Sequence, residues 1–127
     1  MDSREKARAK RLKDCFGLTP AEWDKINDYQ DGLCFFCRKA QKSGKRLATD
    51  HCHITGIIRG VLCSQCNRLL GKIERSGWRV ETLELVISYL VAPPAIRALG
   101  KTVIGFPGRI GTKRHRDWLR KRKKEKI

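Results

Sequence analysis

Two pairs of cysteines most constrain how this chain of 127 residues can fold. Cys34 and Cys37 form one Cys-x-x-Cys pair, Cys63 and Cys66 form the other, and 25 residues separate the two pairs. Each pair can place two sulfurs on one cation, and two pairs supply the four-sulfur tetrahedral shell that structural zinc prefers. Because four sulfurs leave no position for water, we expect a zinc ion that stabilises the fold. Two unrelated buried pairs, or a redox pair, are the alternatives.

The chain is strongly basic, with 29 Lys and Arg against 13 Asp and Glu and a formal net charge of +16. Such a surface attracts polyanions, of which nucleic acid is the commonest in a cell, although a merely soluble basic protein is the alternative. No apolar stretch reaches the roughly 18 residues that span a bilayer, and no apolar signal segment begins the chain. These features predict a cytoplasmic protein that binds no membrane. In a reducing compartment six cysteines favour a metal site over disulfides.

The order of the predicted elements is strand, strand, helix, with helices on either side. Residues 47–62 alternate as in a β-hairpin, and residues 63–75 carry apolar side chains three or four apart, as in an amphipathic helix. The sequence therefore predicts a small α+β fold, with a zinc-stapled domain over 17–92. A basic N-terminal arm or helix precedes it at 1–16, and a Pro/Gly linker with a basic tail or helix follows at 93–127.

Two features at the start and end of the central domain refine this prediction. Thr19 can cap a helix, with Pro20 at its first position and Glu22 completing a capping box. A second amphipathic helix is predicted over 78–90, and the prolines after it should stop it.

The segment Asp50-His51-Cys52-His53 carries the groups that phosphodiester hydrolysis requires, together with Asn67 directly after the last paired cysteine. His51 can deprotonate a water near neutral pH. The Asp50 carboxylate and the Asn67 carbonyl are oxygen ligands suited to Mg²⁺ or another divalent cation. Each residue also has a structural explanation, since an Asp beside a His often makes a turn hydrogen bond and an Asn near a helix start is often a cap. Strand alternation would place His51 and His53 on one face and Asp50 on the other.

The string DHCHITGIIRGVLCSQCNRLLG, with CFFC and GLTPAEWDKINDYQDGLC upstream, resembles the recombination endonuclease VII family. The resemblance runs from about Gly17 to Gly71, with the features of the family in the same order at compatible spacing. These features are the two cysteine pairs, the DHxH strand at 50–53, the TG turn at 55–56, the RG step at 59–60 and the CN junction at 66–67. The resemblance implies a phage-type metal-dependent DNA endonuclease with an HNH (ββα-metal) core that cleaves branched DNA such as Holliday junctions. A general or site-directed nicking endonuclease of the HNH type is the alternative within the enzyme class. A non-catalytic zinc-containing DNA-binding module is the alternative outside it.

The resemblance also implies roles for individual residues. Asp50 and Asn67 correspond to ligands of the catalytic Mg²⁺, His51 to the general base, and His53 to a histidine that contacts or orients the phosphate. The four paired cysteines correspond to ligands of the structural zinc. The chain departs from the junction-resolving pattern at Leu70, where an acidic residue is expected. Its C-terminal region is also unlike the family's dimerisation region, which leaves a homodimer open.

Contacts to the DNA phosphate backbone are expected from two groups of basic residues. The group near the proposed site consists of Arg59, Arg68 and Lys72. The C-terminal group consists of Lys113, Arg114, Arg116, Arg120, Lys121, Arg122, Lys123, Lys124 and Lys126. A run of charges this long is also typical of a solvated tail. Nothing in the sequence resembles a motif that reads bases, so no sequence specificity is predicted.

Overall fold

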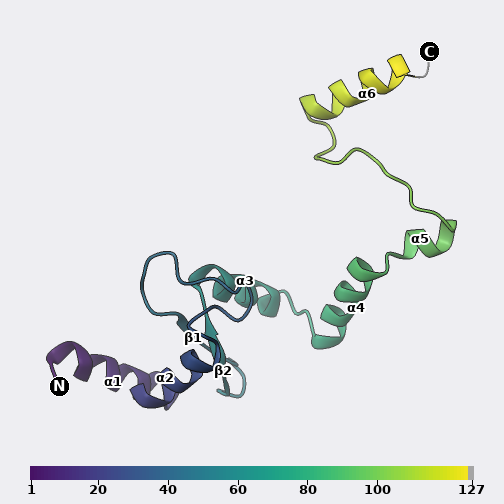
Figure 1. The fold of residues 1–127 in the computed structure, drawn as a ribbon. Helices are drawn as coiled ribbons and strands as arrows, with labels where there is room; N and C mark the ends of the chain where they lie inside the picture. The colour runs from purple at the N-terminus through teal and green to yellow at the C-terminus, as the bar shows by residue number, and fades with distance from the viewer. Residues whose placement is uncertain (126–127) are drawn as a thin grey trace. The chain divides into compact units, whose positions relative to one another are not determined.

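The computed structural model describes residues 1–125, which hold six helices and one two-stranded antiparallel sheet. The elements follow the order α1 (Ser3–Phe16), α2 (Pro20–Tyr29), β1 (Ala48–His51), β2 (Ile58–Leu62), α3 (Ser64–Arg75), α4 (Val80–Val91), α5 (Pro94–Leu99) and α6 (Lys113–Glu125) (Figure 1). The small α+β fold predicted from the sequence is therefore confirmed. In the described part of the chain, no helix combines the length and the apolar character that crossing a membrane requires. The chain divides into two compact units, Met1–Trp78 and Arg79–Ile127.

Capping boxes begin the first two helices. At α2 the Thr19 hydroxyl accepts a hydrogen bond from the Glu22 amide at 3.1 Å, and the Glu22 carboxylate accepts one from the Thr19 amide at 2.9 Å. Asp2 and Glu5 make the equivalent pair at α1, which ends at Gly17 in a left-handed conformation with φ of 67°. The predicted cap at Thr19 is confirmed, and the basic N-terminal segment is a helix.

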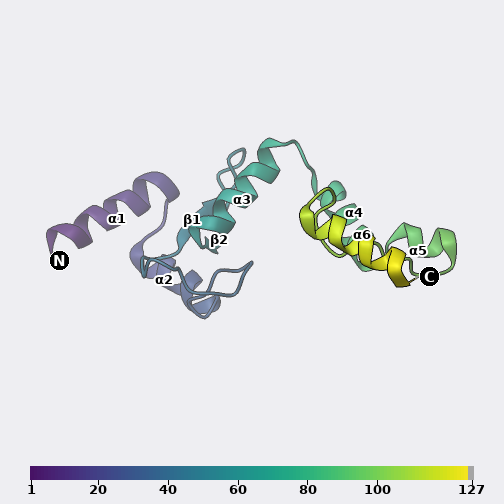
Figure 2. The ribbon, with the colours of Figure 1, turned by 90° about the horizontal axis from the view of Figure 1, so that it is seen from above.

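The hairpin of β1 and β2 has an irregular register. Asp50 lies opposite Gly60 and His51 lies opposite Ile58, so a bulge interrupts the ladder between Asp50 and His51 and leaves Arg59 without a partner across the strands. The extra residue lies on β2, so the bulge shifts the alternation of side chains along β2 at Arg59. The hairpin lies between α2 and α3 in both views (Figures 1 and 2), with β2 contacting α2 and β1 contacting α3.

The core of the first unit lies where β2 meets the cysteine pairs. Its buried side chains come from α1, α2, β2 and the segments beside the elements: Leu12, Trp23, Cys34, Leu47, Val61, Leu62 and Cys63. Cys34 and Val61 are fully buried. Because two of these seven core residues are paired cysteines, the packing of the unit depends directly on what the cysteines bind.

The side chain of Gln30, directly after α2, forms hydrogen bonds to β2 and accounts for the glycine at position 60. Its side-chain amide donates to the Val61 carbonyl at 2.8 Å and to the Leu33 carbonyl at 3.0 Å, and its oxygen accepts from the Val61 amide at 2.9 Å. A Cβ at Gly60 would lie 2.8 Å from that oxygen. Since three hydrogen bonds fix the Gln30 side chain, position 60 has no room for a larger residue.

The second unit contains α4, α5 and α6, and Pro93 and Pro94 separate the first two as the sequence predicts. Trp118 of α6 packs against Phe106 of the preceding loop, with ring centroids 5.4 Å apart. His115 lies beside the same ring at 5.1 Å. An aromatic cluster within this unit therefore anchors the start of the basic helix.

Candidate metal centre and active site

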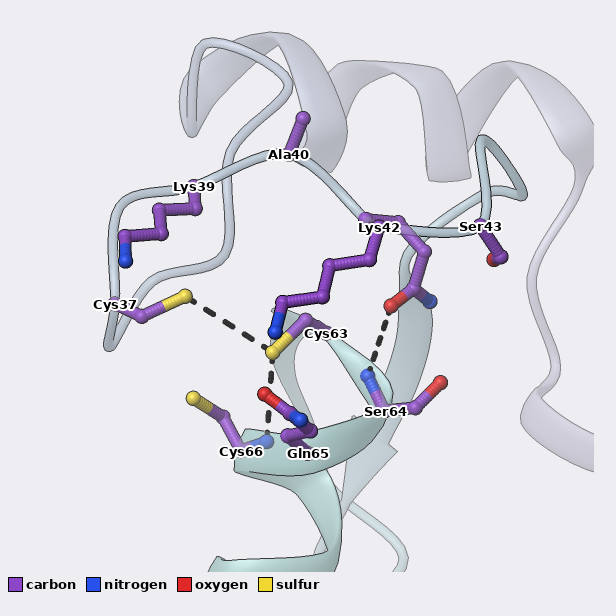
Figure 3. Close-up of a pocket in the computed structure, with 10 residues that line it drawn as sticks. Cys37, Lys39, Ala40, Lys42, Ser43, Cys63, Ser64, Gln65 and Cys66 are labelled. Carbon is purple, nitrogen blue, oxygen red and sulfur yellow. Dashed lines mark hydrogen bonds between the residues drawn. The ribbon is translucent and has the colours of Figure 1, made fainter.

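The four paired cysteines converge on one point. Their sulfurs all lie within 4.8 Å of one another, and the Sγ atoms of Cys37 and Cys63 are 3.9 Å apart. Figure 3 shows the sulfurs of Cys37, Cys63 and Cys66 turned toward one another. A tetrahedron with Zn–S bonds of about 2.3 Å has sulfurs roughly 3.8 Å apart. The cluster therefore fits a zinc ion in both donor type and spacing.

Local backbone geometry places each pair of sulfurs. In the first pair a tight turn is closed by the Arg38 amide donating to the Cys34 carbonyl at 2.9 Å, and Arg38 is left-handed with φ of 60°. In the second pair Cys63 is the N-cap of α3, and its sulfur accepts a hydrogen bond from the Cys66 amide at 3.4 Å. The turn and the helix start therefore each bring two sulfurs to the point where all four meet.

The electrostatics of the cluster favour a bound cation. Burial raises the pKa of the Cys34 thiol, but the backbone amides of Cys37, Cys63 and Phe36 outweigh this effect and bring the pKa to about 6. Burial and the neighbouring sulfurs of Cys63 and Cys34 raise the pKa of Cys66 to about 12. A bound divalent cation would favour the deprotonated form of these clustered thiols.

Arg59 connects both strands to α3. Its Nε and Nη2 donate to the two carboxylate oxygens of Asp50 at 2.8 and 3.0 Å, and its Nη1 and Nη2 donate to Glu74 at 3.2 and 3.1 Å. The Asp50 side chain is only 10% exposed. The Arg59 guanidinium lowers the pKa of Glu74, and the two carboxylates raise the pKa of Arg59. Sequence reasoning missed Glu74, although it lies seven residues after Asn67 and so on the same helical face.

The two histidines of the DHxH segment lie together at the end of β1. The half-buried His51 ring packs edge-on against Phe16, with centroids 5.4 Å apart, and against His53, with centroids 4.7 Å apart. His53 lies beyond the strand and is exposed. Contact with Phe16 of α1 fixes the orientation of the His51 ring next to Asp50.

Asn67 and Asp50 line different cavities in this structure. It is half-buried in α3 and lines a cavity of about 600 Å³ together with residues of α1, whereas Asp50 lines another of about 270 Å³ together with Leu70. Both oxygens of Asp50 are engaged by Arg59. Within residues 1–125 the four cysteines form the one group of three or more Asp, Glu, His or Cys side chains that converge as metal ligands. The Asp50 carboxylate and the Asn67 side-chain carbonyl are oxygen donors that suit a hard cation chemically.

The basic residues expected at DNA occupy different surroundings. Arg68 and Lys72 are exposed on α3, whereas Arg59 is held by two carboxylates. The described members of the C-terminal group are exposed on α6, where Arg122 stacks on Trp118 at 4.7 Å and Arg120 pairs with Asp117 at 2.6 Å. Lys126 lies outside the described residues.

Arg59→Ala is expected to lower the free energy of unfolding by about 2 kcal/mol, because it leaves the buried Asp50 carboxylate without a partner. Urea unfolding at neutral pH measures this loss. The double variant Asp50→Asn/Arg59→Ala should lose less than the sum of its two single changes, since both remove the same ion pair. Wild-type stability in Arg59→Ala, or strict additivity in the double variant, would contradict the role assigned to this bridge.

Glu74→Gln is expected to change how stability depends on pH. The pKa of Glu74 is lowered in the folded protein, so the Arg59–Glu74 pair stabilises the fold above the ordinary glutamate range near pH 4.3. That stabilisation is lost as pH falls through the lowered value. The difference in unfolding free energy between wild type and Glu74→Gln should be constant above about pH 5 and shrink below about pH 4. A difference in unfolding free energy that stays constant down to acid pH would contradict the stabilising role of the Arg59–Glu74 pair.

Comparison with known proteins adds a family match and two relatives. The family model described as recombination endonuclease VII matches residues 9–92. The Gene 59 protein of Mycobacterium phage D29 is 38% identical over 96 residues, which cover 73% of this chain and 55% of that protein. The Gene 59 protein of Mycobacterium phage L5 is 36% identical over 96 residues, covering 73% of this chain and 56% of that protein. The chain thus spans about half the length of these relatives. No solved structure matches it significantly.

Proposed function

Because this chain belongs to the recombination endonuclease VII family, we propose that it is a metal-dependent DNA endonuclease with an HNH (ββα-metal) core. The observation that carries the proposal is the placement of His51 at the end of β1, at the irregular step of a hairpin whose second strand leads directly into α3 at the cysteine cluster. The match over residues 9–92 includes this hairpin, α3 and both cysteine pairs. A nuclease needs such a rigid support because small errors in the position of a base cost large factors in rate.

His51 is the residue we assign as general base. Its ring is half-buried, and Phe16 and His53 fix its orientation, so it can accept a proton from a water beside a phosphodiester. We assign the exposed His53 to contact with the phosphate. A zinc ion bound by the four cysteines would join the turn at 34–37 to the start of α3 and would take no part in proton transfer.

Asp50 and Asn67 are the residues we assign to the catalytic cation. A bound Mg²⁺ would neutralise charge on the phosphate and stabilise the leaving oxygen. Arg59 donates one hydrogen bond to each oxygen of Asp50, so a cation would be bound through the remaining lone pairs of the carboxylate, beside the guanidinium charge. Glu74 shares that guanidinium and offsets part of its charge.

We propose branched DNA, including four-way junctions, as the substrate class, with a nicking endonuclease as the alternative. Leu70 favours the alternative, because it packs against the core where junction resolution is expected to use an acid. One observation also favours a non-catalytic DNA-binding module, namely the salt bridge that occupies Asp50.

A panel of DNA structures separates these functions. Zinc-loaded protein is incubated with Mg²⁺ and end-labelled four-way junction, Y-junction, nicked duplex, linear duplex and single-stranded RNA of matched sequence, and the products are mapped. The proposed function predicts cuts near the branch point and much slower cleavage of linear duplex. Equal rates on branched and linear DNA would support the nicking endonuclease. Binding without any cleavage would overturn the nuclease and support the binding module.

A further inference from the structure

We propose that the cavity between α1 and the hairpin binds the sugar–phosphate backbone of a DNA strand beside His51. This inference rests on the proposed function and adds a binding site to it. The cavity has a volume of about 600 Å³, and its cationic lining consists of Arg8, Arg11, Lys45 and Arg46. None of these four residues belongs to the two basic groups that the sequence predicts to contact DNA.

The charge of the cavity is of one sign. Its four cations come from two segments far apart in the sequence, α1 and the segment that leads into β1, and no Asp or Glu lines it. Leu12, Trp23 and Leu47 form apolar, buried parts of its wall. A concave surface of one charge with low-dielectric walls concentrates the electric field and attracts an anion. A phosphodiester backbone, which carries one negative charge per nucleotide, matches a row of four cations.

Arg8 supplies a second, independent observation. Its Nη2 is buried and has no hydrogen-bond acceptor among residues 1–125, and the nearest carboxylate oxygen, on Asp24, is 4.0 Å away. A buried guanidinium donor without an acceptor is costly. The guanidinium lies over the Trp23 ring at 5.1 Å, and the Trp23 indole is itself fixed by a 3.1 Å hydrogen bond to the Thr49 hydroxyl. Arg8 is therefore held at the wall of the cavity by Trp23, and a phosphate in the cavity would give its guanidinium a closer anion than the Asp24 carboxylate at 4.0 Å.

The cavity connects directly to the proposed catalytic residues. Phe16 lines the cavity and packs edge-on against His51 at 5.4 Å. Asn67, assigned above to the catalytic cation, also lines it. A backbone bound along Arg8 and Arg11 would thus place a neighbouring phosphate close to the base. Arg59, the basic residue expected there from the sequence, is instead held by Asp50 and Glu74.

A matched pair of double variants tests the cavity. Arg11→Ala/Arg46→Ala removes two cations from its lining, and Lys6→Ala/Lys13→Ala removes two cations from the opposite face of α1, outside the lining. Binding to a labelled four-way junction and to linear duplex is followed by fluorescence anisotropy without added Mg²⁺, over a range of salt concentrations. Far-UV circular dichroism and zinc content confirm that both proteins are folded.

The cavity variant should bind roughly tenfold more weakly at about 0.1 M salt, and the slope of log Kd against log salt should fall by about 1.8, or about 0.9 per lost phosphate contact. The Lys6→Ala/Lys13→Ala control should change Kd by less than about threefold, since it removes charges outside the cavity whose effect on the bound DNA is screened by salt. Equal effects of the two double variants would overturn the cavity site even if wild type cleaves DNA. A selective loss of binding, with no cleavage by wild type, would support the cavity site and overturn the nuclease.

Discussion

Cys63→Ser is expected to unfold the Met1–Trp78 unit and to abolish its binding of zinc. Cys63 is a member of the sulfur cluster, the N-cap of α3 and part of the buried core. Structural zinc contributes roughly 10–16 kcal/mol of apparent binding free energy in zinc-finger peptides, which is comparable with the roughly 5–15 kcal/mol net stability of a whole domain. Loss of one of four ligands therefore removes most of what holds this small core together. Metal analysis of the purified protein and thermal melting by circular dichroism measure both effects.

The matched control for this prediction is Cys15→Ser. Cys15 is an exposed cysteine of α1 outside the cluster, so its replacement should leave zinc content and melting temperature unchanged. Addition of a strong chelator to the wild type should reproduce the effect of Cys63→Ser. A Cys63→Ser protein that melts cooperatively at the wild-type temperature without zinc would show that the cluster is not a structural metal site.

His51→Ala is expected to slow the single-turnover cleavage of DNA by about 10²–10⁴-fold, the usual contribution of a positioned general base. DNA affinity should change by less than about twofold, because the cations that bind phosphate lie on other residues. The measurement is single-turnover cleavage at saturating Mg²⁺, with Kd determined in parallel on the same labelled DNA.

His115→Ala is the control for the loss of a histidine. His115 packs on Phe106 in the second unit and is not assigned to the proposed site, so its replacement should leave the cleavage rate within about twofold of wild type. Cleavage by His51→Ala at the wild-type rate would show that another group is the base. A parallel loss of affinity and rate would assign His51 to binding.

Much of the fold could be predicted from the sequence because its signals are local. The capping box at Thr19, the turn between the strands and the helix after Cys63 each depend on residues within a few positions of one another. The convergence of the four cysteines follows from their spacing. The bulge after Asp50 could not be predicted, because alternation contains no information on where a register slips.

The rest of the candidate site depends on tertiary packing. Arg59 was expected to contact phosphate, and the structure instead holds it between Asp50 and Glu74, which come from a different strand and from α3. A sequence shows that an arginine needs an anion but not which carboxylate lies nearest. The cavity lined by Arg8 and Arg46 is likewise formed only when α1 packs beside the hairpin.

The most direct test of the proposed function is a Mg²⁺ titration of the cleavage of a labelled four-way junction, with zinc content measured at every point. Separate structural and catalytic metal sites predict that about one zinc per chain stays bound throughout, while the cleavage rate rises from the background without Mg²⁺ to a plateau. Full cleavage without Mg²⁺, or no cleavage at any concentration of Mg²⁺ by protein that retains its zinc, would contradict a metal-dependent nuclease built on Asp50, His51 and Asn67.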